Sequence, residues 1–182
     1  MRNKILDIIY FICISILFCE SAIANKINGY VSESKTNSET ISQYFKSNMP
    51  TNKNIIYTLV PMGIIISIPT SELFEEHEIE IKENAKDLLF KLGKIIKTIG
   101  KPCVVEGNVL TQNEDDEISN LELSIIRAEK LVEFFIKNNG ISTQKLQSIG
   151  FGEMSPFADN VSYKEHLNKR IDFLILNYEW NR

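Results

Sequence analysis

The segment S-N-L-E-L-S-I-I-R-A, residues 119–128, carries an amide and a guanidinium at a spacing that suits ligand binding. Asn120 and Arg127 lie seven residues apart, which is two turns of an α-helix, so both side chains would project from one helix face. A guanidinium pairs with a carboxylate through two parallel hydrogen bonds, and the free N–H groups of a helix N-terminus also favour an anion. The spacing alone leaves two interpretations open, a receptor for a carboxylate or a solvated helix face on which Arg127 pairs with a local Glu.

The sequence contains no recognisable set of catalytic or metal-binding residues. His77 and His166 lie far apart and have no Cys or His at metal-ligand spacing. Cys103 is the one cysteine after residue 24, and its C-V-V context is typical of a buried strand. We find no Ser/His/Asp or Cys/His arrangement and no Gly-rich phosphate loop. We therefore predict a protein that is not an enzyme, with no catalytic residue, metal or cofactor.

The charge distribution argues against nucleic acid as a partner. The 182 residues carry a formal net charge of −4, and the Lys and Arg side chains are scattered along the chain. A protein that binds nucleic acid needs a basic face.

The N-terminus has the organisation of an export signal. Arg2 and Lys4 precede an apolar run at residues 8–19, and Ala22 and Ala24 form an A-x-A cleavage site. The run is short for a membrane-spanning helix, which needs about 20 residues. We expect residues 1–24 to be a signal peptide cleaved near Ala24, or an uncleaved N-terminal membrane anchor. Either alternative places the rest of the chain outside the cytoplasm.

The remaining chain divides into a polar linker and one folded domain. We assign residues 25–53 to a linker with a short helix at 38–49, and residues 54–178 to the domain. Apolar periodicity predicts helices at 81–99 and 120–139, and the inward face of the second helix is predicted to carry Leu121, Ile125, Ala128, Val132 and Phe135. A hairpin from residue 54, strands ending at 107 and at 152, and a strand at 170–176 complete the pattern, while residues 70–74 are expected to be extended. The fold class is an α/β (α+β) two-layer sandwich, a mixed sheet packed on two main helices.

Three blocks in this order resemble the OmpA-like domain family, which includes OmpA, the peptidoglycan-associated lipoproteins and the C-terminal domain of MotB. They are V-V-E-G at 104–107, the segment at 119–128, and S-I-G-F-G-E-M-S-P-F-A-D-N at 148–160 followed by N-K-R-I-D at 168–172. The second block resembles the MotB form most. The resemblance covers residues 59–176 and implies an OmpA-like fold.

The resemblance also implies noncovalent binding of peptidoglycan through the diaminopimelate of its peptide stem. Arg127 would take the carboxylate, with Asn120 on the same face, and Asn168 and Arg170 would line the pocket. The second block, at 119–128, keeps the family motif. Near the third block, Glu165 stands three residues before Asn168, where the family commonly has an Arg.

The motif that should receive the ammonium of diaminopimelate departs from the family. The family's G-H-T-D is G-N-V-L at 107–110, so Leu110 occupies the position of the binding Asp. Loss of one partner of a desolvated charge pair costs about 2–5 kcal/mol. Glu114, Asp115 and Asp116 lie in the same loop and are candidates to replace the carboxylate, or form a solvated acidic loop.

The leading hypothesis is an exported protein of the periplasm or cell envelope of a Gram-negative-type bacterium, anchored to the wall through weakened peptidoglycan binding. The alternative is a degenerate module of the same fold that binds other envelope proteins, or a second copy of itself, without binding the wall. A wall hydrolase is the third hypothesis, for which the sequence offers no nucleophile or carboxylate pair. We assign no ion conduction, because the acid nearest the apolar run, Asp7, lies on its signal-like side.

Overall fold

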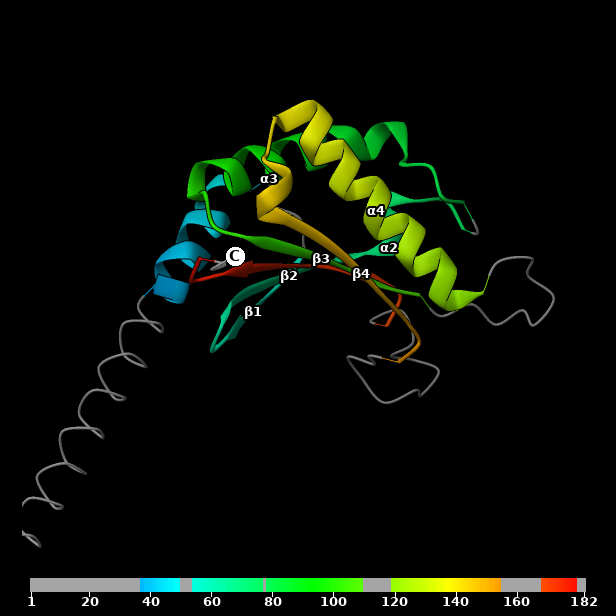
Figure 1. Cartoon of the computed structure of the whole chain (residues 1–182), viewed down its shortest axis with the longest axis horizontal. Helices are drawn as coiled ribbons and strands as arrows, with labels where there is room; N and C mark the ends of the chain where they lie inside the picture. Colours follow the sequence, from blue (N-terminus) through cyan, green and yellow to red (C-terminus); the bar gives the residue numbers. More distant parts are fainter. Residues whose placement is uncertain (1–36, 50–53, 77, 110–118, 155–167, 180–182) are drawn as a thin grey trace, which may run out of the picture.

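The computed structural model describes residues 37–49, 54–76, 78–109, 119–154 and 168–179. The described residues form two layers, with helices packed on one face of a single sheet (Figure 1). The fold class expected from the sequence is confirmed.

The sheet has five strands in the order β1-β2-β5-β3-β4. β1 (Ile56–Val60) and β2 (Gly63–Pro69) form the expected hairpin, and β5 (Arg170–Leu176) pairs antiparallel with both β2 and β3 (Cys103–Asn108). β4 (Leu146–Gly152) runs parallel to β3. The last strand of the chain thus lies at the centre of the sheet, so its residues are buried along their whole length.

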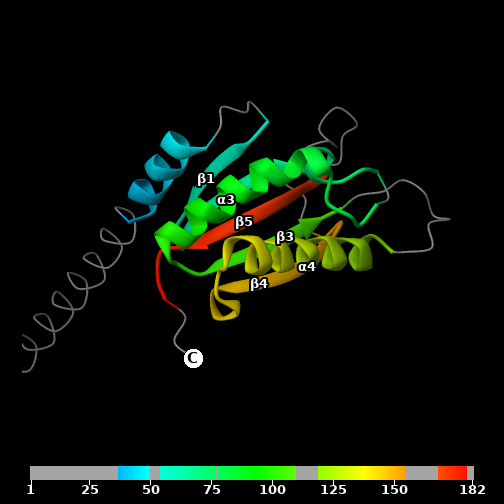
Figure 2. The same cartoon turned by 90° about the horizontal axis from the view of Figure 1, so that it is seen from above.

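Two long helices cover one face of the sheet side by side (Figure 2). α3 (Lys86–Ile99) follows a 3-10 turn at Glu83–Ala85, and it ends at Gly100, which has a φ of 68°. α4 (Asn120–Asn139) ends in the same way at Gly140. A glycine accepts this left-handed conformation without the steric penalty of a Cβ, which explains both endings. A second 3-10 turn, Thr143–Lys145, leads into β4.

Residues 70–73 differ from the sequence-based expectation. Thr70–Leu73 form a one-turn helix, α2, directly after β2, where the sequence predicts extended backbone. The side chain of Leu73 is fully buried. Burial of this side chain stabilises a turn that no local periodicity signals.

A helix at residues 37–48 packs against the sheet and joins the main hydrophobic core through Ile41 and Phe45, together with Met49. Asn177, just after β5, donates a hydrogen bond of 3.0 Å from its Nδ2 to Ser38 Oγ. The sequence pattern predicts this helix, but as part of the linker. Its apolar side chains lie in the same core as those of the sheet.

α4 presents a different face to the sheet from the one expected. Ala128 and Phe135 are buried as predicted, but Leu121 and Ile125 are exposed by 43% and 38%. The inward face instead includes Leu123, Ser124, Arg127 and Leu131. Apolar periodicity cannot identify this face, because it places the arginine on the solvent side.

Two glycines set the distance between α4 and the sheet. A Cβ on Gly107 would lie 2.2 Å from the backbone oxygen of Ser124, and a Cβ on Gly150 would lie 2.4 Å from Cγ1 of Ile125. Only a residue without a side chain permits this approach. Within the described residues, no helix is long and apolar enough to cross a membrane.

Candidate ligand-binding site

Four segments of the chain meet at one end of the sheet, where the sequence motifs predict a ligand site. They are the adjacent ends of the parallel strands β3 and β4, taken together, the start of α4, the start of β5, and the residues just after α2, Glu75 and Glu78. The Thr70 amide donates to the Lys169 carbonyl at 2.9 Å, and the Val109 amide donates to the Gly152 carbonyl at 3.0 Å. These bonds hold together segments that lie far apart in the sequence.

Arg127 lies at this end of the molecule and its side chain is almost completely buried. Its Nε donates to the Glu78 carbonyl at 2.8 Å, and its Nη2 donates to the Glu75 carbonyl at 3.0 Å. The guanidinium carbon lies 5.0 Å from the centre of the Phe74 ring, a cation–π geometry. Arg127 therefore fastens the segment after α2 to α4, and these bonds use Nε and Nη2 but not Nη1.

Burial changes the electrostatics of Arg127 without removing its charge. Desolvation lowers the pKa of Arg127 to about 10, and the nearby charge of Glu78 acts in the opposite direction. The guanidinium stays protonated at neutral pH. A cation in a desolvated position attracts an anion more strongly than an exposed cation does.

The first turn of α4 is tied to the end of β4. Ser124 Oγ donates to the Leu121 carbonyl at 2.7 Å and accepts from the Gly152 amide at 2.9 Å. Ser119 caps the helix by accepting from the Glu122 amide at 3.2 Å. Asn120 lies over Gly152, since a Cβ on this glycine would approach the Asn120 carbonyl carbon to 3.3 Å. The helix start thus faces the same end of the molecule as Arg127.

Asn168 and Arg170 are also buried at this end, at the start of β5. Arg170 forms an ion pair with Asp172, with its Nε 2.8 Å from Oδ2, and Asn108 Nδ2 donates to the same oxygen at 3.2 Å. Sequence reasoning did not find this cluster. The period of two along β5 places Arg170 and Asp172 on one face, but only the register with β3 brings in Asn108.

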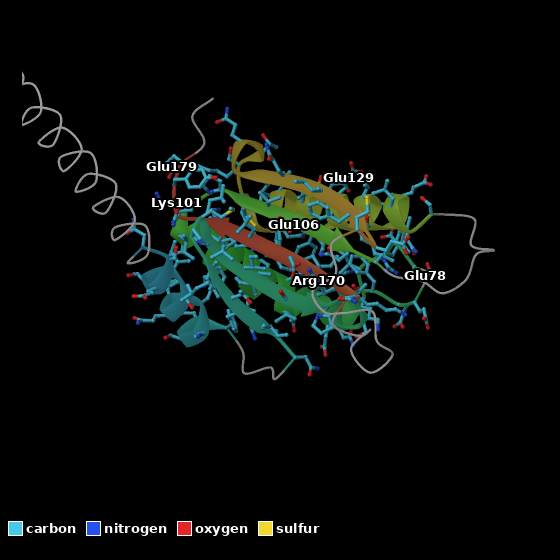
Figure 3. All side chains as sticks on the ribbon, turned by 90° about the horizontal axis from the view of Figure 1, so that it is seen from below. Glu78, Lys101, Glu106, Glu129, Arg170 and Glu179 are labelled. Carbon is cyan, nitrogen blue, oxygen red and sulfur yellow. The ribbon has the colours of Figure 1, made fainter. Side chains whose placement is uncertain are left out.

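This cluster occupies the sheet face opposite the helices, which Figure 3 views with Glu106 and Arg170 labelled. Glu106 pairs in register with Asp172. Burial and then the charge of Asp172 raise the pKa of Glu106, while Arg170 lowers it. Burial raises the pKa of Asp172, against the effects of Arg170, Ser67 and Asn108. The half-buried carboxyl group of Glu106 and the buried one of Asp172 therefore lie near the same guanidinium, that of Arg170.

A groove of about 550 Å³ lies on the other side of the segment that Arg127 holds. Its charged lining includes Glu72, Glu75 and Lys82, with Lys169 from the N-K-R motif. Lys82 Nζ lies 3.1 Å from the Glu75 carboxylate and donates to the Ser71 carbonyl at 2.9 Å. The walls of this groove carry both signs of charge.

Several predicted site residues lie outside the described residues. They are Leu110 and the acidic candidates Glu114, Asp115 and Asp116, together with Glu165 and both histidines. Of the predicted ligand contacts, Asn120, Arg127, Asn168 and Arg170 lie in the described part, at the same end of the fold. Among the described side chains, no group of three or more His, Cys, Asp or Glu residues could hold a metal ion.

Comparisons with known proteins agree with this architecture. The OmpA family model matches residues 73–170. A MotB-like protein from Desulfovibrio vulgaris superposes with a TM-score of 0.69 at 19% identity, covering 85% of this chain and 98% of that chain. The cell wall anchor of the T6SS from Pseudomonas aeruginosa superposes with a TM-score of 0.66 at 14% identity, covering 75% and 96%. At these identities the likeness shows the fold.

The periplasmic domain of Helicobacter pylori MotB gives a TM-score of 0.61 at 20% identity, covering 71% of this chain and 87% of that one. In sequence, the uncharacterized protein YtxE of Bacillus subtilis is 26% identical over 117 residues, which are 62% of this chain and 48% of YtxE. This chain therefore spans about half the length of that relative.

Proposed function

Because the chain belongs to the OmpA family, we propose that it is a noncatalytic protein of the cell envelope whose domain binds peptidoglycan without a covalent bond. Similarity in fold to a cell wall anchor and to the periplasmic domain of MotB supports this proposal. The ligand group is the diaminopimelate of the peptide stem, which carries a carboxylate and an ammonium at its free end.

The observation that carries the proposal is the anchored guanidinium of Arg127. Backbone carbonyls of Glu75 and Glu78 fix its orientation, and Nη1 takes no part in those two bonds. A cation held in one orientation loses little freedom when it binds an anion, which favours affinity. Arg127 therefore binds the ligand carboxylate, with Asn120 and Asn168 at the same end of the fold, whereas Arg170 pairs with Asp172 on the opposite sheet face.

The ammonium has a weaker receptor in this chain. Leu110 occupies the position of the motif Asp and offers no acceptor. The affinity is accordingly reduced relative to a domain that keeps the Asp, and binding depends mainly on the carboxylate end.

We further propose that the protein acts in the periplasm. The segment 1–24 exports it, and is either removed near Ala24 or kept as an anchor. A protein tethered by this segment would link a membrane to the wall, whereas a cleaved one would be a soluble wall-associated protein.

Sedimentation with purified sacculi tests the wall-binding function. The wild-type chain should pellet with sacculi, and free diaminopimelate should release it. Arg127→Ala should bind about 30-fold more weakly or worse, because the ligand carboxylate loses its charge partner. Arg127→Lys keeps the charge but loses the planar fork, so it should bind between the two.

Lys130→Ala provides the matched control. Lys130 is a cation one turn further along α4 and pairs with Glu80 at 2.8 Å. Its loss removes the same charge from the same helix, so pelleting should stay at the wild-type level. Equal losses in both variants would mean that net charge, and not a site at Arg127, drives the binding.

An envelope interaction module is the second candidate function. Two features favour it, the missing motif Asp and the use of two Arg127 donors by the protein's own backbone. If the wild-type chain does not pellet with sacculi at any concentration, wall binding is rejected and the envelope interaction module becomes the favoured function.

A further inference from the structure

The segment after α2 carries four described carboxylates, and their surroundings differ. Glu75 and Glu80 form ion pairs with lysines, at 3.1 Å and 2.8 Å. Glu76 lines the groove of about 550 Å³, and Arg127 is not among the residues that line it. Glu78 is exposed and forms no ion pair within the described part of the chain. Of these four carboxylates, Glu78 is therefore the one available to a ligand near Arg127.

Glu78 lies beside the guanidinium of Arg127. Its backbone carbonyl accepts from Arg127 Nε at 2.8 Å, and its amide donates to the Glu75 carbonyl at 3.2 Å, so a turn fixes its backbone against the arginine. The charge of its carboxylate opposes the fall in the pKa of Arg127 that burial causes. Figure 3 shows Glu78 at the end of the molecule where β5 begins. The carboxylate thus acts on the guanidinium, although the two groups form no direct ion pair.

This arrangement of charges matches a zwitterion. The free end of diaminopimelate carries its carboxylate and its ammonium on the same carbon atom, so its receptor needs a cation and an anion side by side. Arg127 supplies the cation, and its Nη1 takes no part in the two bonds to backbone carbonyls. A ligand with a carboxylate alone would be repelled by Glu78, whereas the ammonium of a zwitterion is attracted to it.

We propose that Glu78 receives the ammonium of the diaminopimelate whose carboxylate Arg127 binds. This inference rests on the proposed function, since both charges belong to the same ligand. Leu110 offers no acceptor at the position of the motif Asp, so the anion comes instead from the segment after α2. Glu78 is exposed, and an exposed ion pair contributes little to affinity. The residue therefore determines which ligand is preferred more than how tightly the ligand is held.

Binding of two soluble stem peptides to the full chain tests the proposal. Both peptides end in diaminopimelate, and in one of them the nitrogen at its free end is acetylated and therefore neutral. The wild-type chain should bind the stem with the free ammonium about threefold more tightly, as expected for one exposed ion pair. Isothermal titration calorimetry measures both dissociation constants.

The same titrations separate this proposal from the proposed function. Equal affinity of the wild-type chain for the two stems would overturn the role of Glu78 and leave wall binding through Arg127 in place. Binding of neither stem would overturn both.

Glu78→Gln should change the affinities for the two stems in opposite directions. The stem with the free ammonium should bind about threefold more weakly, because the ammonium loses its partner. The acetylated stem should bind at least as tightly as it binds the wild type, because the anion that repels a lone carboxylate is gone. A disturbed fold would weaken both stems alike, and that result would contradict the proposal. The comparison of the two stems on the wild-type chain does not depend on this variant.

Glu76→Gln is the matched control. It removes the same charge from an exposed side chain two residues earlier, and Glu76 is not among the groups that shift the pKa of Arg127. Both stems should bind this variant as they bind the wild type. If Glu76→Gln weakens the stem with the free ammonium as much as Glu78→Gln does, the preference comes from the summed charge of the segment, and the specific role of Glu78 is wrong.

Discussion

Arg127 performs a structural task, and under the proposed function the same side chain also binds the ligand carboxylate. Its Nε and Nη2 hold the carbonyls of Glu78 and Glu75, while its ring partner Phe74 shields one face of the guanidinium. A ligand carboxylate would therefore meet a cation whose position is set before binding. Under the proposed function, Leu110 leaves the ammonium of the ligand without the acceptor that the motif Asp would supply.

Restoring that acceptor should strengthen binding. Leu110→Asp recreates the family's motif position, so we expect affinity for sacculi to rise about 30-fold, the inverse of removing one charge partner. Leu110→Asn is the control, because it adds polarity without the charge. Binding curves from pelleting would measure both, and equal curves for the Asp and Asn variants would show that no ammonium is bound near residue 110.

The sequence identified Arg127 and Asn120 as a pair because their spacing is local. It could not identify the backbone partners of Arg127, which come from residues 49 and 52 positions away along the chain. The Asp172 cluster was missed for the same reason, since Asn108 joins it across 64 positions. Long-range partners follow from strand register, which residue types alone do not encode.

At the scale of elements, the approach of α4 to β3 positions the site, and Gly107 controls it. A Cβ at Gly107 would lie 2.2 Å from the Ser124 carbonyl oxygen. Gly107→Ala should therefore destabilise the fold by about 3 kcal/mol, since backbone on both sides cannot yield easily. Urea unfolding followed by circular dichroism would measure this.

Gly100→Ala gives the comparison for that prediction. Gly100 has a φ of 68° but nothing closer than 4.0 Å to an added Cβ. Its replacement should cost about 1 kcal/mol for backbone conformation alone. A cost for Gly107→Ala no larger than this would mean that α4 shifts freely on the sheet.

Elements themselves were well predicted where a periodic pattern or a glycine marks them. The hairpin, the helix at 120–139, the glycine ends of both long helices and the last two strands are confirmed. The helix predicted at 81–99 begins instead at Lys86, because Ile81 lies in a β-bridge with Phe74. The orientation of α4 was wrong because burial of Arg127 turns Leu121 and Ile125 outward. Hydrophobic periodicity assumes that charge faces water, and a functional or structural arginine violates this assumption.

For the whole molecule, the cluster of Glu106, Asp172 and Arg170 should make the free energy of unfolding depend on pH. The pKa values of both carboxyl groups are raised by burial, so the folded state holds their protons more tightly than the unfolded state. Their contribution to stability is therefore full below the unfolded pKa and is lost as pH rises through the folded pKa.

Glu106→Gln should reduce the stability that the folded state loses as pH rises, because Gln carries no charge at any pH. We expect a higher melting temperature than the wild type at neutral pH, with the difference shrinking as pH falls toward about 4, near the ordinary pKa of Glu. Glu129→Gln, on the exposed side of α4, removes the same charge from a solvated position and should show no such pattern. Thermal unfolding across this pH range measures both, and parallel curves for the two variants would contradict the predicted effect.

The extent of the folded unit could be read only in part from the sequence. The helix at 37–48 is visible as a pattern, but its polar surroundings favour a linker. Its core contacts through Phe45 and its bond from Asn177 to Ser38 depend on the far end of the chain. Such contacts across 139 positions become apparent only once the sheet order is known.

The position of β5 has a mechanical consequence. This strand begins at Arg170, at the end of the fold with the proposed ligand site, and is followed by Asn177, which bonds to the helix at 37–48. A pull between a bound wall and the N-terminal side of the chain would therefore act along the axis of β5. Its hydrogen bonds to β2 and β3 lie across that axis, so they would bear the load together in shear instead of opening one at a time. The central strand would make the domain a stiff coupling under tension.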